Sequence, residues 1–540
     1  MPRILINERD KTSPGTPDSY ANYAVLLVGF KNSAITDGEI EPDSNGVYEF
    51  NSKSDFKSTI GLVSSIDNNG NRHLGNQMAY ELLNLGYTVL YKPISDVMEL
   101  TNEDFWEVFK DKANYDFRFV SHGLIGSTDL TSHSGYLNYT KQRDEAFHAL
   151  EKLYTLAGKS LKTGTDGKVN QVTESILTEE AYGEFIQSEE AKSLPGLIDP
   201  DTKEIYLTFA IAYPSIVSIH NMAVDNLKDL DAATLDEKSF NEINGNIANL
   251  AHYLADVDNT GRGDCVALIE VDETKYKNSI DKPENAIIDA VNDMTQITKS
   301  NGKYCAATVP SVSYRMDVED EFDDNKTFPG AFHYLACFIN SLRSGFAEWY
   351  AAAGYTRGTS SYIVAKTSVK LGEIAINALE PRNTTFKTDD NGNPMEGCGP
   401  KFSCNVVANF RGSYYLWGNR TAHELGQVDA KADLVASHFL NIRQLCTTIK
   451  KQLYVACRRF TFDPNSDVLW VNFTNAIKPT LETMKADQGI RDYKIVKVTT
   501  DKKATLKAKI RIIPIEAVED FDLEVSLEDS FGETAAVVNE

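Results

Sequence analysis

The stretch CVALIEVDETKYKNSIDKPENAIIDAVNDMTQITKSNGKYCAATVP (residues 265–310) decides the fold class of this chain. Its first seven residues form the short continuous apolar run that is typical of a buried strand. Residues 283–302 carry the apolar spacing of a helix that ends at a glycine, and residues 303–310 indicate a second strand. Strand, helix and strand in this order predict an α/β layer.

The N-terminal part of the chain continues this pattern. YAVLLVGF (23–30) predicts another buried strand, and VYEFNSKSDFKSTIG (47–61) predicts a strand followed by a short helix. GNQMAYELLNLGYTVLYKPI (75–94) predicts a helix, a glycine stop and a strand. Residues 1–20 hold three prolines and little apolar sequence, so we expect an extended arm. Residues 96–250 mix helical and turn-rich stretches without a repeat, and they indicate no particular fold.

A second part of the chain begins after TDDNGNPMEGCGP (388–400), which has the composition of a domain boundary. The segment 441–460 predicts a helix with one apolar face, made of Ile442, Leu445, Cys446, Ile449, Leu453, Ala456 and Phe460. After the turn FDPNSD, where Ser466 or Asp467 can cap the next helix, a second apolar stripe follows: Leu469, Phe473, Ile477, Leu481 and Met484. Pro479 lies within this helix and is expected to kink or break it.

A hairpin-like pair of strands (493–500 and 505–513) and an acidic segment (521–529) end the sequence. In the second strand Thr505, Lys507, Lys509 and Arg511 share one face, and Leu506, Ala508, Ile510 and Ile512 share the other. The acidic segment alternates in the same way, with Asp522, Glu524 and Glu528 opposite Phe521, Leu523, Val525 and Leu527. Paired side by side, a basic face would meet an acidic face at roughly 0.2–1 kcal/mol per cross-strand pair. From the residues alone, this pairing can occur within one chain or between two chains.

Charge and composition exclude several classes of function. The 540 residues carry a net charge of −24, which argues against nucleic acid or an anionic membrane as a partner. Residues 396–540 are balanced, with 19 basic and 19 acidic residues, so the negative charge lies in the remainder of the chain. No apolar run reaches the length of about 18 residues that a membrane span needs, and the start lacks the apolar core of a signal peptide. Seven scattered cysteines favour a reducing cytoplasm during synthesis.

The sequence contains only weak matches to catalytic and metal-binding motifs. CGPKFSC (398–404) brings two cysteines together without the second pair that a zinc site needs. DVEDEFDD (317–324) lacks the alternating ligands of a calcium loop, so a solvated acidic loop is favoured. SHG (121–123) and RGD (262–264) are interpreted as incidental. We expect no catalytic residue, no cofactor and no metal site.

At several separated places, and in the right order, the chain resembles the sheath proteins of contractile phage tails and related injection machines. The segments that carry this resemblance are YAVLLVGFKNSAITDGEI with VYEFNSKSDFKSTIGL, NQMAYELLNLGYTVLYKPI, GDCVALIEV with KYCAATVPSV, FPGAFHYLACFINSLRSGFAEWYAAAGYTRGTS, YLWGNRT, NIRQLCTTIKKQLYVACRRFTFDPNSDVLW, and RDYKIVKVTTDK with IRIIPIEAVEDFDLEV. Together they cover about two thirds of the chain. Pro479 and the strongly acidic C-terminal segment depart from the family's pattern.

The resemblance implies a multidomain α+β protein: an inner C-terminal α/β domain with strand-exchanging terminal arms, and outer mixed α/β domains. The expected division is an arm (1–20), an α/β core (21–95 and 251–395), a variable outer insertion (96–250) and an inner domain (396–540) whose residues 516–540 form a second arm. Strand exchange between subunits is then expected to involve Ile4, Ile6, Lys507, Lys509, Arg511, Asp522, Leu523, Glu524, Val525, Leu527 and Glu528.

The resemblance also implies a function without catalysis. Stacked hexameric rings would surround an inner tube and contract to drive that tube through a cell envelope during genome delivery. The expected partners are other copies of the chain, the tube protein, and the baseplate and tail terminator proteins, within a virion tail assembled in the host cytoplasm. The helix exit with Lys485, Asp487, Gln488 and Arg491 is the favoured tube contact, and Arg458 and Arg459 are the alternative.

Two other hypotheses stay open at this point. The chain could be the sheath of a bacteriocin, a type VI system or an extracellular injection system, or it could be a cytoplasmic α/β enzyme without a recognisable motif.

Overall fold

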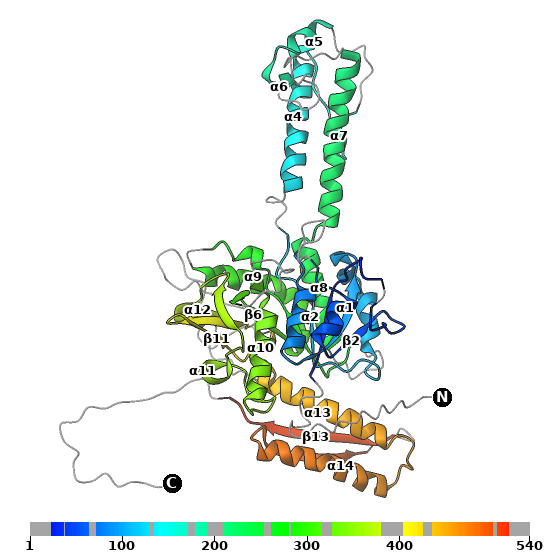
Figure 1. Cartoon of the computed structure of the whole chain (residues 1–540), viewed down its shortest axis with the longest axis vertical. Helices are drawn as coiled ribbons and strands as arrows, with labels where there is room; N and C mark the ends of the chain where they lie inside the picture. Colours follow the sequence, from blue (N-terminus) through cyan, green and yellow to red (C-terminus); the bar gives the residue numbers. More distant parts are fainter. Residues whose placement is uncertain are drawn as a thin grey trace, which may run out of the picture.

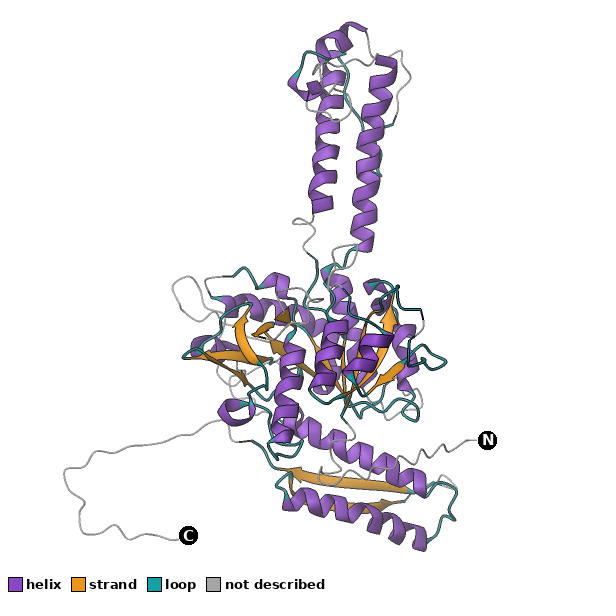
Figure 2. Ribbon diagram, in the orientation of Figure 1, coloured by secondary structure: helices purple, strands orange, loops and turns teal. Residues whose placement is uncertain are grey.

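The computed structural model describes residues 23–36, 38–63, 72–128, 134–170, 179–192, 209–252, 261–279, 282–315, 327–379, 403–424, 435–499 and 505–517. These residues form three parts along the long axis of the molecule: a helical projection, a central α/β layer and a C-terminal layer (Figure 1). Figure 2 shows that strands concentrate in the last two parts, whereas the projection consists mainly of helices. None of the described helices combines the length and the apolar character that crossing a membrane requires.

An eight-stranded sheet forms the middle of the central layer, in the order β11-β10-β6-β5-β4-β1-β3-β2. The strands from β10 to β3 run parallel, and the two edge strands β11 and β2 run antiparallel to their neighbours. The strands are β1 (Ala24–Phe30), β2 (Tyr48–Phe50), β3 (Thr88–Ile94), β4 (Phe119–Ser121), β5 (Val266–Ile269), β6 (Cys305–Val309), β10 (Asn405–Phe410) and β11 (Ser413–Trp417).

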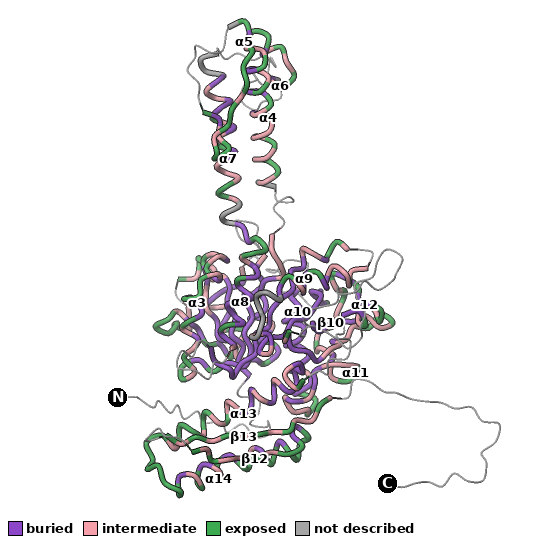
Figure 3. Tube along the Cα trace, turned by 180° about the vertical axis from the view of Figure 1, so that it is seen from behind, coloured by how far each residue is buried: buried purple, intermediate pink, exposed green. Residues whose placement is uncertain are grey.

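Helices cover both faces of this sheet, because its parallel strands are apolar on both sides. One face packs against α1 (Lys53–Thr59), α2 (Gly75–Asn84) and α10 (Gly330–Arg343). The other packs against α3 (Glu103–Glu107), α8 (Glu237–Ala251), α9 (Pro283–Thr298) and α12 (Glu373–Leu379), with short 3-10 turns at Val97–Thr101, Val108–Lys110, Glu273–Lys275 and Lys299–Tyr304. The buried residues of the chain accordingly concentrate in this layer (Figure 3).

Local sequence signals explain several boundaries in the central layer. Ser52 caps α1 by accepting a hydrogen bond from the Ser54 backbone, and Gly86 ends the α2 segment with a φ of +82° that favours glycine. Gly75 starts α2 where a Cβ atom would lie 1.7 Å from the carbonyl oxygen of Val28. Only glycine therefore allows α2 to approach β1 this closely.

A small three-stranded sheet joins the central layer beside β10. It has the order β8-β7-β9, with β7 (Val312–Arg315), β8 (Thr327–Phe328) and β9 (Ile363–Thr367). The four-residue helix α11 (Gly354–Arg357) leads into β9.

The helical projection is a hairpin of two long helices, α4 (Ser134–Leu156) and α7 (Phe209–Ala233), with α5 (Glu179–Phe185) and α6 (Glu189–Lys192) at its tip (Figure 1). It has an apolar cluster of its own, separate from the clusters of the central layer. Within it the hydroxyls of Tyr154 and Tyr213 lie 2.9 Å apart. At the base, the backbone N–H of Thr128 donates to the carbonyl of Leu235 at 2.8 Å, so the chain enters and leaves the projection at one place.

The C-terminal layer contains two antiparallel helices and a two-stranded sheet. Its elements are α13 (Leu440–Arg459), α14 (Asp467–Ala486), β12 (Ile490–Val498) and β13 (Lys507–Pro514), preceded by a 3-10 turn at Ala436–His438. Ser466 caps α14 by accepting from the Leu469 backbone, as the sequence predicts. Pro479 does not break the helix, and α14 continues through it to Ala486.

The observed sheet crosses the domain boundaries that the sequence predicts. β4 and α8 fall within the expected outer insertion (96–250), yet both belong to the central layer. β10 and β11 fall within the expected inner domain (396–540), yet they extend the same sheet. Strand order depends on contacts between distant segments, which a boundary drawn from composition does not contain. The multidomain mixed α/β fold class itself is confirmed.

Candidate assembly interface

The C-terminal layer has an apolar cluster of its own, built mainly from the two stripes that the sequence predicts and joined by Trp349 from the segment after α10. All five predicted residues of α14 are buried, and Leu445 and Ile449 of α13 pack against them. Leu453, Ala456 and Phe460 border the same cluster and are partly buried. The helix periodicity of the sequence is therefore confirmed in both helices.

The two-stranded sheet covers this core with one face and leaves the other face open. Leu506, Ala508, Ile510 and Ile512 pack toward the helices, together with Tyr493 and Ile495 of β12. Lys507, Lys509 and Arg511 are exposed on the opposite face, where Arg511 lies opposite Lys494 on β12. The alternation predicted for 505–512 is confirmed. We call the exposed side chains of Lys494, Lys507, Lys509 and Arg511 the basic face.

Both strands of this small sheet are edge strands. Within the residues that the structure describes, β12 pairs only with β13. An edge strand presents unpaired N–H and C=O groups and can receive an additional strand. The layer can therefore accept another segment beside the basic face.

The sequence predicts that segments from both ends of the chain exchange with this sheet. Ile4 and Ile6, and likewise Asp522, Leu523, Glu524, Val525, Leu527 and Glu528, lie outside the described residues. Strand exchange itself stays a prediction.

Buried polar contacts hold the first half of α13 against the central layer. Arg118, which precedes β4, donates from Nε to Oε1 of Gln444 (2.8 Å) and from Nη2 to the carbonyl of Gln444 (3.0 Å) and Oγ1 of Thr448 (2.9 Å). Nδ2 of Asn441 donates to the carbonyl of Trp349 at 3.2 Å. The predicted helix face did not indicate these contacts, because the sequence separates Arg118 from Gln444 by more than 300 positions.

A charged cluster lies beside this junction. Arg262 and Asp264 form a buried ion pair at 3.0 Å, and Lys451 of α13 pairs with Asp116. Burial is the main cause that lowers the pKa of Lys450 to about 8, and the neighbouring Arg443 guanidinium lowers it further. The RGD tripeptide is thus an internal structural element and not an exposed recognition loop.

The SHG tripeptide is equally internal. Ser121 and His122 are fully buried, and Nε2 of His122 lies 2.9 Å from Oδ1 of Asn244. Burial lowers the pKa of His122 to about 4, so its imidazole is neutral at physiological pH. Of the two cysteines in 398–404, Cys404 is described and buried, while 317–324 lies outside the described residues. Among the described residues no group of three or more acidic, His or Cys side chains could hold a metal ion.

The end of α14, favoured as the tube contact, is exposed but does not protrude. The indole N–H of Trp349 donates to the carbonyl of Asp487 at 3.0 Å, and this holds the helix end against the central layer. Lys485 forms an exposed ion pair with Asp492 at 3.0 Å. Gln488 turns the chain with a φ of +59°, and Arg491 is exposed on β12. The end of α14 is thus tied to Trp349, and its role as the tube contact stays a prediction.

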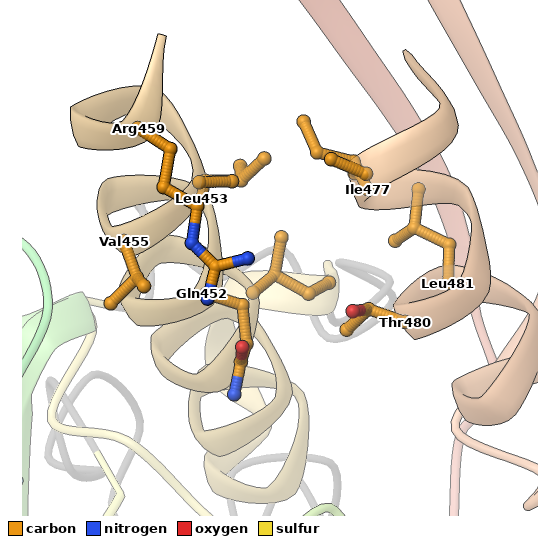
Figure 4. Close-up of a pocket in the computed structure, with 10 residues that line it drawn as sticks. Gln452, Leu453, Val455, Arg459, Ile477, Thr480 and Leu481 are labelled. Carbon is orange, nitrogen blue, oxygen red and sulfur yellow. The ribbon is translucent and has the colours of Figure 1, made fainter. Parts of the chain in front are cut away.

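The end of α13 is the freer of the two. Only the first half of this helix is buried, and Arg458 and Arg459 lie at the far end, next to the turn into α14 (Figure 1). A groove of about 210 Å³ opens there between α13 and α14 (Figure 4). Apolar side chains of both helices line it, together with the polar Gln452, Arg459 and Thr480. Either end of the layer can thus present cations to a partner.

Comparison with known proteins adds evidence from structure only. No protein-family model matches the chain, and no curated protein matches it in sequence. A chain in the cryo-EM structure of the anti-feeding prophage (AFP) baseplate, 6-fold symmetrised, is similar with a TM-score of 0.50 and 11% identity, over 98% of this chain and 99% of that chain. Two further matches cover 98% of each chain: the PVC sheath complex of an extracellular contractile injection system in the contracted state (TM-score 0.45, 11% identity) and the AFP baseplate in the contracted state (0.46, 13%).

At these identities the likeness establishes the fold. The resemblance to contractile sheath proteins that the sequence predicts is thereby confirmed at the level of the fold, which this chain shares with a chain of the AFP baseplate.

Proposed function

We propose that this chain is a structural, non-enzymatic subunit of a contractile sheath, which assembles as stacked hexameric rings around an inner tube. The observation that carries the proposal is the fold similarity over 98% of the chain to a chain of the six-fold AFP baseplate. The setting we propose is a contractile injection system. A phage tail that delivers a genome is one form of such a machine, and an extracellular system or bacteriocin is another.

The C-terminal layer supports assembly by strand exchange. Its basic face is exposed, and among the described residues each of its two strands pairs only with the other. This arrangement suits the alternating sequence 521–529, whose acids would share one side of an extended strand. We propose that this segment of one subunit adds to β12 or β13 of a neighbour, with its acids beside Lys507 and Lys509. The N-terminal arm, with Ile4 and Ile6, would join the same mesh of strands.

The layer would also face the tube, because it lies at the opposite end of the molecule from the helical projection (Figure 1). We propose that Arg458 and Arg459 make this contact in preference to Lys485 and Arg491. No carboxylate pairs with either arginine among the described residues, whereas Lys485 is already paired with Asp492. A contact made of a few exposed charges also suits a grip that must be released. Baseplate and terminator proteins would meet the ends of the stack.

Electron microscopy of the purified protein tests the proposal directly. Long striated tubules are expected, in low salt and at high protein concentration. Discrete globular particles under all assembly conditions, alone and with tube protein, would instead favour a soluble α/β enzyme.

A charge exchange tests the strand pairing. Lys507→Glu with Lys509→Glu should weaken polymerisation, measured by sedimentation, because each cross-strand pair contributes roughly 0.2–1 kcal/mol and every subunit repeats the contact. Adding Glu524→Lys and Glu528→Lys should partly restore it. A combined variant no better than the double variant would show that the two faces do not meet.

A further inference from the structure

The two ends of the central sheet differ in chemistry, and the β11 end is basic. Residues 353–372 and 403–422 contain five basic residues and no acid. Lys366, Lys370 and Arg411 are exposed, and no ion pair engages them within the described part of the chain. Within the described residues 373–379, which follow directly, Glu373 at the start of α12 is the one acid. In a chain with a net charge of −24, this end therefore stands out as a cationic surface.

Apolar side chains accompany these cations. Tyr355, Ile363 and Ile374 are 60%, 66% and 81% exposed, respectively. Tyr355 lies against Trp417 of β11, with ring centroids 5.4 Å apart, and against Phe410 of β10 at 5.7 Å. Exposed apolar groups that gather beside charged ones are typical of a surface that meets another protein.

The backbone at this edge is already engaged. The N–H of Leu416 points away from β10 and donates to the carbonyl of Gly358 at 2.7 Å. The segment after α11 thus covers part of the edge of β11, and simple strand addition is obstructed there. What remains available is a surface of side chains.

The opposite end of the same sheet is acidic. Residues 38–50, which include the edge strand β2, and residues 95–109, which include α3, contain nine acids and no Lys or Arg. Lys31 bonds to the hydroxyl of Tyr48 on β2, and Lys110 pairs with Glu107, so acids outnumber the cations at this end. The two segments lie together, because Lys92 of β3 donates to the carbonyl of Phe105 at 3.3 Å and β3 pairs with β2. Glu39, Glu41 and Glu103 are exposed, and within the described residues no ion pair engages them.

We propose that the basic and apolar β11 end of one subunit docks on the acidic β2 end of a second copy of this chain. Opposite ends of one sheet carry opposite charge, so the contact is head-to-tail, and head-to-tail contacts close into rings when the rotation permits. Figure 1 shows the two ends at opposite sides of the central layer, with β11 and α12 at one side and α1 and β2 at the other. The contact rests on the proposed function, since it is the lateral contact within a ring. It is separate from the strand exchange in the C-terminal layer.

Two variants reverse one end each. Lys366→Glu, Lys370→Glu and Arg411→Glu make both ends acidic. Glu39→Lys, Glu41→Lys and Glu103→Lys, in a second variant, make the β2 end basic, so that both ends of this variant are basic. A matched control carries Lys141→Glu, Lys159→Glu and Lys162→Glu on the helical projection, far from both ends. All substituted side chains are exposed, so the thermal unfolding midpoints should match the wild type and exclude misfolding.

Assembly is then followed by sedimentation and electron microscopy at low ionic strength, where exposed charges are least screened. Each variant alone should need about tenfold more protein to assemble, because like charges oppose each other across the contact. An equal mixture should assemble near the wild-type concentration, since every contact then joins opposite ends in an alternating ring. The control should behave as the wild type.

The outcomes separate this contact from the proposed function. A wild type that forms no tubules overturns the sheath proposal and this contact with it. If the wild type assembles and both variants assemble equally well, or the mixture rescues nothing, the lateral contact is overturned while the sheath stands.

Zero-length carbodiimide cross-linking of wild-type tubules gives a second readout. Lys366 or Lys370 should link to Glu39, Glu41 or Glu103 of another copy. If those carboxylates are linked only to other sites, the contact is contradicted.

Discussion

Replacing Arg118 with Met should detach the C-terminal layer from the central layer without unfolding the sheet. The Arg118 side chain is 2% exposed and makes three hydrogen bonds to α13, two to Gln444 and one to Thr448. Methionine keeps an apolar side chain at this position. It removes every donor, together with the guanidinium that lies 5.3 Å and 5.8 Å from the ring centroids of Tyr23 and Phe338.

The magnitude follows from those three bonds. A hydrogen bond from a charged donor contributes about 1.5–3 kcal/mol, and bonds that share one side chain do not add fully. Nε2 of Gln444 still donates to the Tyr334 hydroxyl (3.2 Å), and the Thr448 hydroxyl still donates to Glu348 (3.1 Å), so both side chains stay held in place. Oε1 of Gln444 loses the hydrogen bond from Arg118, which adds to the cost. We expect a loss of about 3–5 kcal/mol in the free energy that docks α13, in the range found when a buried charged network loses one member.

Hydrogen exchange, measured at increasing urea concentrations, reports this loss. In the variant, amides of the first half of α13 should exchange faster while those of β1, β4 and β5 keep their protection. Tubules should be lost as well, because the layer that carries the strand edges is no longer held in place. Arg491→Met, at an exposed position on β12, is the matched control and should change stability by less than about 0.5 kcal/mol. An Arg118→Met protein with wild-type exchange in α13 would refute the assignment of Arg118 as the anchor of the layer.

Three further predictions concern the tube, the projection and pH. Arg458→Glu with Arg459→Glu should leave the protein folded and able to form tubules alone, yet stop co-assembly with tube protein. If only Lys485→Glu with Arg491→Glu stops co-assembly, the tube contact lies at the end of α14. Replacing 129–233 with a short Gly-Ser linker should preserve the central layer, judged by its thermal midpoint, because the projection has its own core and both its ends meet at the base. Burial lowers the pKa of His73 to about 3 and of His122 to about 4, so the unfolded chain binds more protons below pH 6.5 and stability should fall as the pH drops toward 4. Each histidine would contribute about 2 kcal/mol of that loss at pH 5, and a flat unfolding midpoint between pH 7 and 5 would contradict the neutral buried histidines.

Short-range periodicity predicts much of the fold. The apolar stripe of α14, the cap at Ser466 and the alternation of β13 all repeat within a few residues, and the structure confirms each of them. These features depend on the geometry of single elements. That geometry is the same wherever the element lies in the molecule.

Features that depend on distant pairing could not be predicted. β4 is three residues long, too short to show a pattern, and it takes its place in the sheet only because β1 and β5 flank it. The burial of Arg262 and Asp264 likewise follows from the elements that surround them, whereas the tripeptide alone resembles an exposed motif. The opposite charges at the two ends of the sheet could not be predicted for the same reason, because the strand order decides which segments lie at each end.

The C-terminal layer is held to the rest of the chain in a way that suits a moving assembly. Its own core packs the helices against the sheet. The first half of α13 and the neighbourhood of Trp349 join it to the central layer through hydrogen bonds, and the Trp349 side chain also packs into that core. Packed apolar cores resist gradual deformation, so a change of shape concentrates at contacts of this polar kind. If the strand edges of the layer are linked to neighbouring copies, the central layers can rotate against one another while the linked layers stay connected. The lateral contact between sheet ends would then differ between the two states of the lattice, and the strand mesh would be common to both.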